Sequence, residues 1–235
     1  MRKQAVLEDA KTVSRVNAPA PAKVIPIHGL IREKKAYEAV KRLFDLSMSF
    51  LALIAFSPII LIIALAIKLE DRGPVFYKHK RVGKNGADLY IYKFRSMAAD
   101  PAPLEEIFTP EQMEQYQREF KVDDDPRITK VGRFLRRTSL DELPQLVNIL
   151  KGELSIVGPR PVLQEETEKY GIYRTKFLSV IPGLTGYWQA NGRSDTTYEQ
   201  RMDMELYYVD HRSLWFDIKI IFQTVGAVLK GKGAK

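Results

Sequence analysis

The chain has 235 residues, a length that is enough for one catalytic-sized domain with appendages. Its formal net charge is +8. It contains no cysteine, so a disulfide framework and thiolate metal sites are excluded. The histidines His28, His79 and His211 lie far apart in sequence, so we expect any bound metal to be a hard cation such as magnesium, held by carboxylate and phosphate oxygens. The positive charge comes without a nucleic-acid-binding motif, and it therefore favours anionic lipid or phosphate ligands over nucleic acid.

The first segment, residues 1–32, has mixed charge and an Ala-Pro stretch. It lacks the apolar core of a signal peptide, and we expect a mobile cytoplasmic leader. Residues 33–42 are rich in basic side chains and predict a helix at a membrane surface, with a solvated helical face as the alternative.

Residues 43–67 form an apolar run long enough to cross a bilayer. Ser57-Pro58 interrupts the run, and Lys and Arg, which mark the cytoplasmic side, flank both ends. Each arm beside Pro58 is about 15–20 Å long, near half the hydrocarbon thickness. The sequence therefore predicts a re-entrant helix kinked at Ser57 and Pro58, with the Ser57 hydroxyl bonded to a carbonyl that the proline frees. A kinked spanning helix and a buried helix of a soluble core are the alternatives.

The remaining elements predict an α/β fold that is mainly helical with a small β-hairpin or sheet. Strands are expected at 75–80 and 89–94 around the turn Asn85-Gly86, and residues 98–125 predict a surface insertion with a helix at 111–120. Further along we expect a helix ending near Leu150, a short strand at 155–157, a helix at 164–180, a turn at 182–186 and helices at 198–211 and 214–229. Three parts follow: the leader 1–32, the membrane part 33–71 and a cytoplasmic catalytic domain 72–235.

Asp141-Glu142 is the strongest candidate for chemistry. The two carboxylates begin a helix one turn after Arg136 and Arg137. Neighbouring helical positions diverge by about 100°, so the pair cannot act as a facing acid and base. A division of roles fits better, in which one carboxylate attacks phosphorus or binds metal and the other orients it or accepts a proton. The structural alternative is a capping box formed by Ser139 and Glu142.

Arginines near turn residues are candidates for binding phosphate, because the planar guanidinium matches phosphate oxygens. Pro159 and Pro161 restrain the backbone around one of them. A solvated surface position is the alternative for each. The candidates are Arg136, Arg137, Arg160 and Arg193.

Taken together, a series of ordered motifs from about residue 33 to the C-terminus is similar to those of a known family. The motifs are Lys41-Arg42-x-Phe44-Asp45, Ser57-Pro58, Gly73-Pro74-Val75-Phe76, Lys93-Phe94-Arg95-Ser96-Met97, Asp125-Pro126-Arg127, Thr138-Ser139-Leu140-Asp141-Glu142-Leu143-Pro144-Gln145, Gly158-Pro159-Arg160-Pro161 and Pro182-Gly183-Leu184-Thr185-Gly186. They resemble the bacterial sugar transferases, the monotopic polyprenyl-phosphate phosphoglycosyl transferases. Some members carry an additional N-terminal membrane domain, and this chain resembles the short form without it.

The resemblance implies that the enzyme moves a sugar 1-phosphate from a UDP-sugar to undecaprenyl phosphate, giving a polyprenyl-diphosphate-sugar and UMP. It implies that Asp141 is the nucleophile of a covalent phosphosugar intermediate, that Glu142 is its partner, and that Mg²⁺ bridges carboxylate and diphosphate. Family positions near the site or its phosphate-binding surroundings match Lys93, Arg136, Arg160, Arg193 and Asp217.

The resemblance also implies a monotopic protein with amphipathic interfacial helices on the cytoplasmic face of the bacterial inner membrane. There it would carry out the first membrane step of exopolysaccharide, capsule, O-antigen or glycoprotein glycan assembly. Expected partners are the UDP-sugar, polyprenyl phosphate and an anionic membrane surface, and the likeness allows a homodimer and contacts with downstream glycosyltransferases. A catalytically silent membrane module and a membrane-bound diphosphate hydrolase are the alternative functions. The residues do not specify the sugar.

Overall fold

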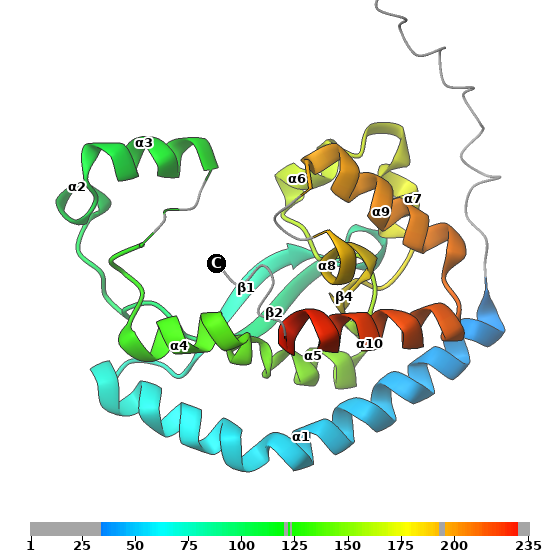
Figure 1. The fold of residues 1–235 in the computed structure, drawn as a ribbon, viewed down its shortest axis with the longest axis horizontal. Helices are drawn as coiled ribbons and strands as arrows, with labels where there is room; N and C mark the ends of the chain where they lie inside the picture. Colours follow the sequence, from blue (N-terminus) through cyan, green and yellow to red (C-terminus); the bar gives the residue numbers. More distant parts are fainter. Residues whose placement is uncertain (1–33, 120–121, 123, 193–195, 230–235) are drawn as a thin grey trace, which may run out of the picture.

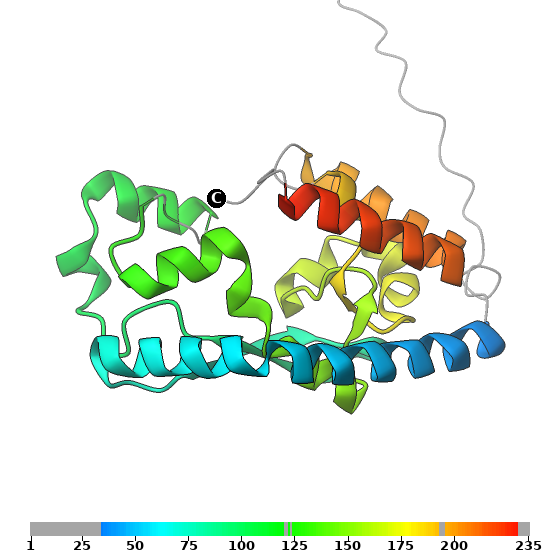
Figure 2. The same cartoon turned by 60° about the horizontal axis from the view of Figure 1, so that its bottom comes forward.

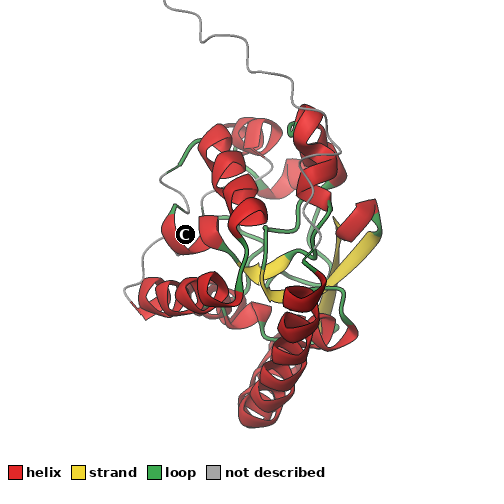
Figure 3. Cartoon of the chain, turned by 90° about the vertical axis from the view of Figure 1, so that its right-hand side faces the viewer, coloured by secondary structure: helices red, strands yellow, loops and turns green. Residues whose placement is uncertain are grey.

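The computed structural model describes residues 34–119, 122, 124–192 and 196–229, so the predicted leader 1–32 lies outside it. Short strands lie among helices, and one long helix runs along an edge of the domain (Figures 1 and 3). This confirms the predicted fold class, mainly helical with a small β-hairpin. The helices are α1 (Lys35–Asp71), α2 (Leu104–Ile107), α3 (Pro110–Glu119), α4 (Lys130–Thr138), α5 (Gln145–Lys151), α6 (Gln164–Glu168), α7 (Arg174–Leu178), α8 (Tyr187–Asn191), α9 (Tyr198–His211) and α10 (Leu214–Leu229). The strands are β1 (Phe76–Val82), β2 (Asp88–Phe94), β3 (Ser155–Val157) and β4 (Gly183–Thr185), and the 3-10 turns are η3 (Lys84–Gly86), η4 (Leu140–Glu142) and η5 (Gly171–Tyr173).

Helix α1 is a continuous helix of 37 residues that bows along the length of the domain (Figures 1 and 2). It continues through Pro58, whose missing N–H leaves the Ile54 carbonyl without its usual donor. The Ser57 hydroxyl donates to that carbonyl at 2.8 Å, as the sequence predicted. The helix ends where Arg72 adopts a left-handed backbone, with φ 58°, before Gly73-Pro74.

The surface of α1 excludes one of the three alternatives raised by its sequence. Among the described residues it is the helix long and apolar enough to cross a membrane, and 11% of its apolar window is buried. Leu61 and Leu69 are 71% and 73% exposed. A core helix would bury most of such a run, so the soluble-core alternative is wrong. The remaining face packs Ile63 and Ile67 against β2 and α4.

The hairpin β1–β2 is antiparallel and pairs Phe76 with Phe94. Its turn contains Asn85 and Gly86 at φ 58° and 82°, values that suit these two residue types, and the predicted turn is confirmed. A second pair, β3 and β4, is parallel. The prediction of a turn at 182–186 was incomplete, because residues 183–185 form β4. This pairing depends on a partner strand distant in sequence, which local patterns do not reveal.

The segment predicted as one helix at 164–180 is divided into α6, η5 and α7. Gly171 has φ +49°, a conformation that interrupts a right-handed helix. Helices α9 and α10 have the predicted limits. Thr197 caps α9 by accepting a hydrogen bond from the Gln200 backbone N–H.

Residues 98–125 carry α2 and α3 away from the rest of the domain (Figure 1). A β-bridge between Met97 and Ile128 joins the two ends of this segment. Beside the bridge, Arg127 pairs with Asp125 at 2.6 Å and lies over the ring of Phe108 at 5.0 Å. These contacts hold the end of this segment beside the start of α4.

Candidate active site

Asp141 and Glu142 lie in η4, a tight turn between α4 and α5. Ser139 begins the turn with φ 56°, an unfavourable conformation for a residue with a side chain. The Ser139 side chain makes no capping hydrogen bond. The capping-box alternative for Ser139 and Glu142 is therefore wrong, and the Glu142 carboxylate is directed to another partner.

That partner is Lys93 of β2, which connects both carboxylates. Its Nζ lies 2.7 Å from Glu142 Oε1 and 3.6 Å from Asp141 Oδ2. Asp141 is 9% exposed, whereas about a third of the Glu142 side chain, 35%, is accessible. Burial raises the pKa of Asp141; Lys93 opposes the rise and the neighbouring Glu142 adds to it. The result is a buried carboxylate that is more basic than usual and is held by a lysine.

Arg136 approaches the carboxylate pair from α4. Its Nε donates to Ser96 Oγ at 2.9 Å, and its positive charge opposes the rise in the Asp141 pKa. Arg137, the next residue, is exposed, and no contact among the described residues joins it to the carboxylates. Sequence reasoning gave Ser96 no role, although it lies in the motif at the end of β2 and holds the Arg136 guanidinium.

Arg160 lies in the loop after β3. Close backbone packing there holds the motif at 158–161 against the motif at 182–186. Gly158 N–H donates to Thr185 O at 2.8 Å, and Gly183 N–H donates to Pro159 O at 2.8 Å. A Cβ on Gly183 would overlap the backbone of Gly158. The Arg160 side chain is exposed, with its guanidinium 5.7 Å from the ring centre of Trp188.

His79 links the position of Arg160 to that of Lys93. Its pKa is lowered to about 4, first by burial and then by the charges of Arg81, Lys93 and Arg160. Lys93 and Arg160 therefore both lie close enough to His79 for their charges to act on its imidazole. His79 itself is neutral at pH 7.

Asp217 belongs to a different part of the molecule. Its carboxylate accepts hydrogen bonds from Tyr37 at 2.8 Å, Lys41 at 2.8 Å and Tyr208 at 2.7 Å. It therefore ties α1 to α9 and α10, and its described contacts do not reach Asp141. Arg193 lies outside the described residues.

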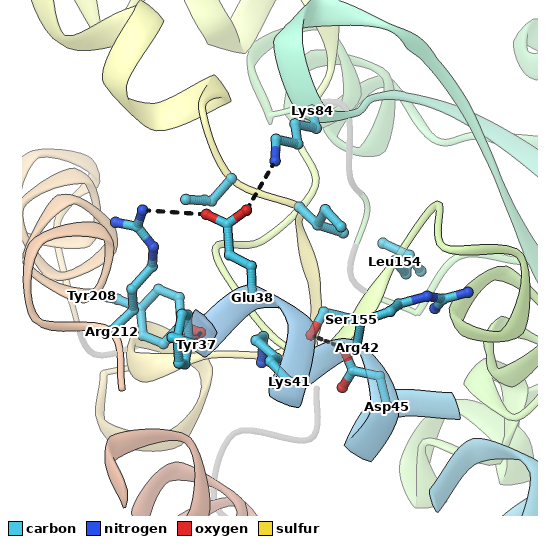
Figure 4. A pocket seen from close by; sticks show the side chains of 12 residues that line it. Tyr37, Glu38, Lys41, Arg42, Asp45, Lys84, Leu154, Ser155, Tyr208 and Arg212 are labelled. Carbon is cyan, nitrogen blue, oxygen red and sulfur yellow. Dashed lines mark hydrogen bonds and ion pairs between the residues drawn. The ribbon is translucent and has the colours of Figure 1, made fainter. Parts of the chain in front are cut away.

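A pocket between the N-terminal part of α1 and the rest of the domain is also separate from the carboxylate pair (Figure 4). Glu38 reaches Lys84 and Arg212, each at 3.7 Å, and Asp45 accepts from Ser155 at 2.7 Å. None of the described site residues lines this pocket. Arg42, which also lines the pocket, donates to the carbonyls of Ile149 and Leu150, and such internally satisfied charged groups are typical of a structural junction.

The described residues contain no group of three or more His, Asp or Glu side chains that could hold a metal alone. Magnesium, however, is commonly bound by one or two carboxylates together with substrate phosphates. Asp141 and Glu142 supply such a pair, so the donor set fits a cation that arrives with a diphosphate.

A carboxylate pair flanked by cations, on a domain lying along an apolar helix, is typical of a membrane-associated enzyme that acts on phosphorylated substrates. The family model described as bacterial sugar transferase matches residues 36–231. The chain therefore belongs to the bacterial sugar transferase family.

Individual relatives agree with this family. The chain is 45% identical over 197 residues to the exopolysaccharide production protein ExoY of Sinorhizobium fredii, covering 83% of this chain and 87% of that protein. It is 43% identical over 204 residues to the undecaprenyl-phosphate galactose phosphotransferase of Salmonella typhimurium, covering 86% of this chain and 43% of that protein. It is 42% identical over 194 residues to the UDP-glucose:undecaprenyl-phosphate glucose-1-phosphate transferase of Escherichia coli, covering 79% of this chain and 39% of that protein. The chain thus spans less than half the length of several relatives and most of ExoY.

Proposed function

We propose that the protein transfers a sugar 1-phosphate from a UDP-sugar to undecaprenyl phosphate, releasing UMP and forming an undecaprenyl-diphosphate-sugar. The observation that carries the proposal is the buried Asp141 carboxylate, with Glu142 beside it and Lys93 in contact with both. The names of the Salmonella and E. coli relatives describe this class of reaction.

In the first step, an oxygen of Asp141 attacks the phosphorus that bears the sugar. An Asp–O–P bond forms, the bond to the bridging oxygen breaks, and UMP leaves with that electron pair. In the second step, an oxygen of the lipid phosphate attacks the same phosphorus and restores the Asp141 carboxylate. The raised pKa of Asp141 favours this role because a more basic carboxylate is the better nucleophile once it is ionised.

The cations around the pair have distinct places in this scheme. Lys93 orients both carboxylates before substrate binds, and it offsets charge on the transferred phosphoryl group. Arg136, fixed by Ser96, and Arg160 bind phosphate oxygens. Magnesium, held by Asp141 and Glu142, would neutralise the charge of the diphosphate.

We infer that α1 enters and leaves the membrane from one side, because both of its ends are tied to the same domain. Near its start, Arg42 donates to the carbonyls of Ile149 and Leu150 at 2.6 and 2.8 Å. At its end, Asp71 forms a bidentate ion pair with Arg95 beyond β2. A spanning helix would place one of these ends about 30 Å away across the hydrocarbon core. The contacts support a monotopic, re-entrant helix that keeps the domain at one membrane surface, and the Lys and Arg residues on both flanks favour the cytoplasmic one.

Helix α10 supports the same placement, because it exposes an apolar stripe. Trp215 and Phe222 are 77% and 73% exposed and lie with Ile218 and Val225 at helical spacing, while Ile220 is buried. Exposed apolar faces of this kind are typical of helices that lie at a membrane interface. We place α10 beside the membrane, with its other face on the domain core.

The direct experiment is transfer by the full chain in lipid nanodiscs, with a panel of UDP-sugars and undecaprenyl phosphate, scored by UMP release and lipid product. We expect Asp141→Asn to abolish transfer and Lys130→Gln, at the exposed start of α4, to retain it. Full turnover by Asp141→Asn would refute the nucleophile. Release of free sugar phosphate without lipid product would favour the hydrolase instead, and absence of any turnover across the panel would favour the silent module.

A further inference from the structure

Three arginines from distant segments meet beside β1. Arg81 comes from the strand itself, Arg160 from the loop after β3 and Arg201 from α9. Burial lowers the pKa of Arg81, and the positive charge of Arg160 lowers it further. Two of the three side chains are largely enclosed, since 12% of Arg81 and 11% of Arg201 is accessible. Like charges brought together away from water require anions to offset them.

The anions present only partly offset this charge. Glu166 lies 3.5 Å from Arg81 and 3.3 Å from Arg201. Glu205 lies 3.4 Å from Arg201 and accepts the backbone N–H of Arg160 at 3.3 Å. Within the described residues, two carboxylates thus face three guanidinium groups.

Several guanidinium hydrogen-bond donors have no acceptor. Arg81 Nε and Arg201 Nη2 are buried, and neither has a hydrogen-bond partner within the part of the chain that the structure describes. In the same described part, the guanidinium of Arg160 contacts the Trp188 ring and makes no ion pair. Buried donors in proteins nearly always find an acceptor, so a ligand that brings oxygens to this cluster would complete it.

Trp188 aligns two of the guanidinium groups. Arg201 lies 4.7 Å and Arg160 5.7 Å from the centre of its ring. The indole Nε1 donates to Thr196 Oγ1 at 2.8 Å, which fixes the ring orientation. Guanidinium groups stacked on an aromatic ring keep their N–H edges free to bind in the plane.

The cluster is continuous with the site around Asp141. Tyr77 is the cross-strand partner of Lys93, and alternate residues on β1 share one face, so Tyr77, His79 and Arg81 follow each other along it. The four residue steps from Tyr77 to Arg81 span about 13 Å of strand. His79 lies between the Lys93 level and Arg81 on this face, and the charges of Lys93, Arg81 and Arg160 all act on it. The long lysine and arginine side chains can therefore converge over His79 on the two phosphates of one diphosphate, which share a bridging oxygen.

We propose that Arg81, Arg160 and Arg201, aligned by Trp188, form the subsite for the phosphate that leaves with the nucleoside. This assignment rests on the proposed function, and it identifies which half of the UDP-sugar the cluster holds. The carboxylate pair and Lys93 handle the phosphoryl group that is transferred. The arginine cluster holds the nucleoside monophosphate before and after the bond breaks, and it determines how tightly the product is retained.

The test is UMP binding by the full chain in nanodiscs, followed by the fluorescence of Trp188 in a Trp215→Phe background. Trp188 and Trp215 are the two tryptophans of the chain. We expect Arg81→Gln and Arg201→Gln each to weaken UMP binding by about tenfold or more, because hydrogen bonds to charged groups contribute that much. Binding of uridine, which lacks the phosphate, should change little.

Three controls separate binding from folding and from catalysis. Lys169→Gln removes an exposed cation that lies 4.3 Å from the Tyr198 ring, close to the cluster, and it should leave UMP affinity near that of the parent. Asp141→Asn should bind UMP normally although it transfers nothing. Arg201→Lys keeps the charge but loses the planar edge of N–H groups. It is therefore the substitute test of UMP binding if Arg201→Gln does not fold.

The outcomes distinguish the two proposals. Folded Arg81 and Arg201 variants that bind UMP like the parent, while the parent makes lipid product, would overturn the subsite and leave the transferase function intact. A parent that binds no UMP and makes no product would overturn both. Weakened UMP binding with unchanged uridine binding would support the subsite.

Discussion

Replacing Asp45 by alanine should loosen the junction that ties α1 to the catalytic domain. Asp45 is 3% exposed, and its two oxygens accept hydrogen bonds from the Ser155 hydroxyl at 2.7 Å and the Ile156 N–H at 3.1 Å. Alanine leaves both donors without an acceptor. Each unsatisfied buried donor costs about 1–3 kcal/mol, so the free energy of unfolding should fall by about 2–6 kcal/mol.

For a chain of this size a loss of that magnitude lowers Tm by roughly 5–20 °C. The assay is thermal unfolding in nanodiscs, with UMP release measured in parallel. Because β3 leads directly to Gly158 and Arg160, transfer should fall as well. Asp45→Asn is the matched control: its amide oxygen retains the Ile156 bond, and the Ser155 hydroxyl accepts from its NH₂ group. An alanine variant with unchanged Tm would refute the view that this junction holds α1 on the domain.

Three further predictions concern the site. Lys93→Met should lower turnover at least about tenfold and move the acid limb of the pH–rate profile to higher pH, because Lys93 opposes the raised pKa of Asp141; an unchanged limb would contradict this. Gly183→Ala should destabilise the chain by at least about 1–3 kcal/mol in thermal unfolding, since its Cβ overlaps the Gly158 backbone, whereas Gly226→Ala, which meets nothing, should not. Removing divalent metal with EDTA should abolish transfer, and added Mg²⁺ should restore it; transfer that continues in EDTA would exclude a role for the metal.

Local signals predicted a large part of the fold. Asn85-Gly86 identified the hairpin, because these residues act on the backbone within a few positions, and the predicted limits of α9 and α10 were confirmed. The carboxylate pair was also visible in the sequence. The bond from the Ser57 hydroxyl to the Ile54 carbonyl followed from the chemistry of the adjacent proline.

Features that depend on distant partners were not predictable in this way. The strand at 183–185 exists because β3 lies beside it, and the left-handed Ser139 excludes the capping box that its spacing suggested. The partners of Asp217 include Lys41, 176 residues earlier in the chain. Neither periodicity nor motif spacing specifies such contacts, since both describe only neighbouring positions.

The most direct test of the proposed mechanism is detection of the covalent intermediate. The full chain is incubated with a UDP-sugar and magnesium without lipid acceptor, UMP release is followed rapidly, and the protein is digested for mass spectrometry. We predict a burst of about one UMP per active site and a sugar-phosphate adduct on the peptide that contains Asp141, which disappears when undecaprenyl phosphate is added. An enzyme that transfers sugar phosphate to the lipid yet shows neither burst nor adduct would contradict the proposed mechanism.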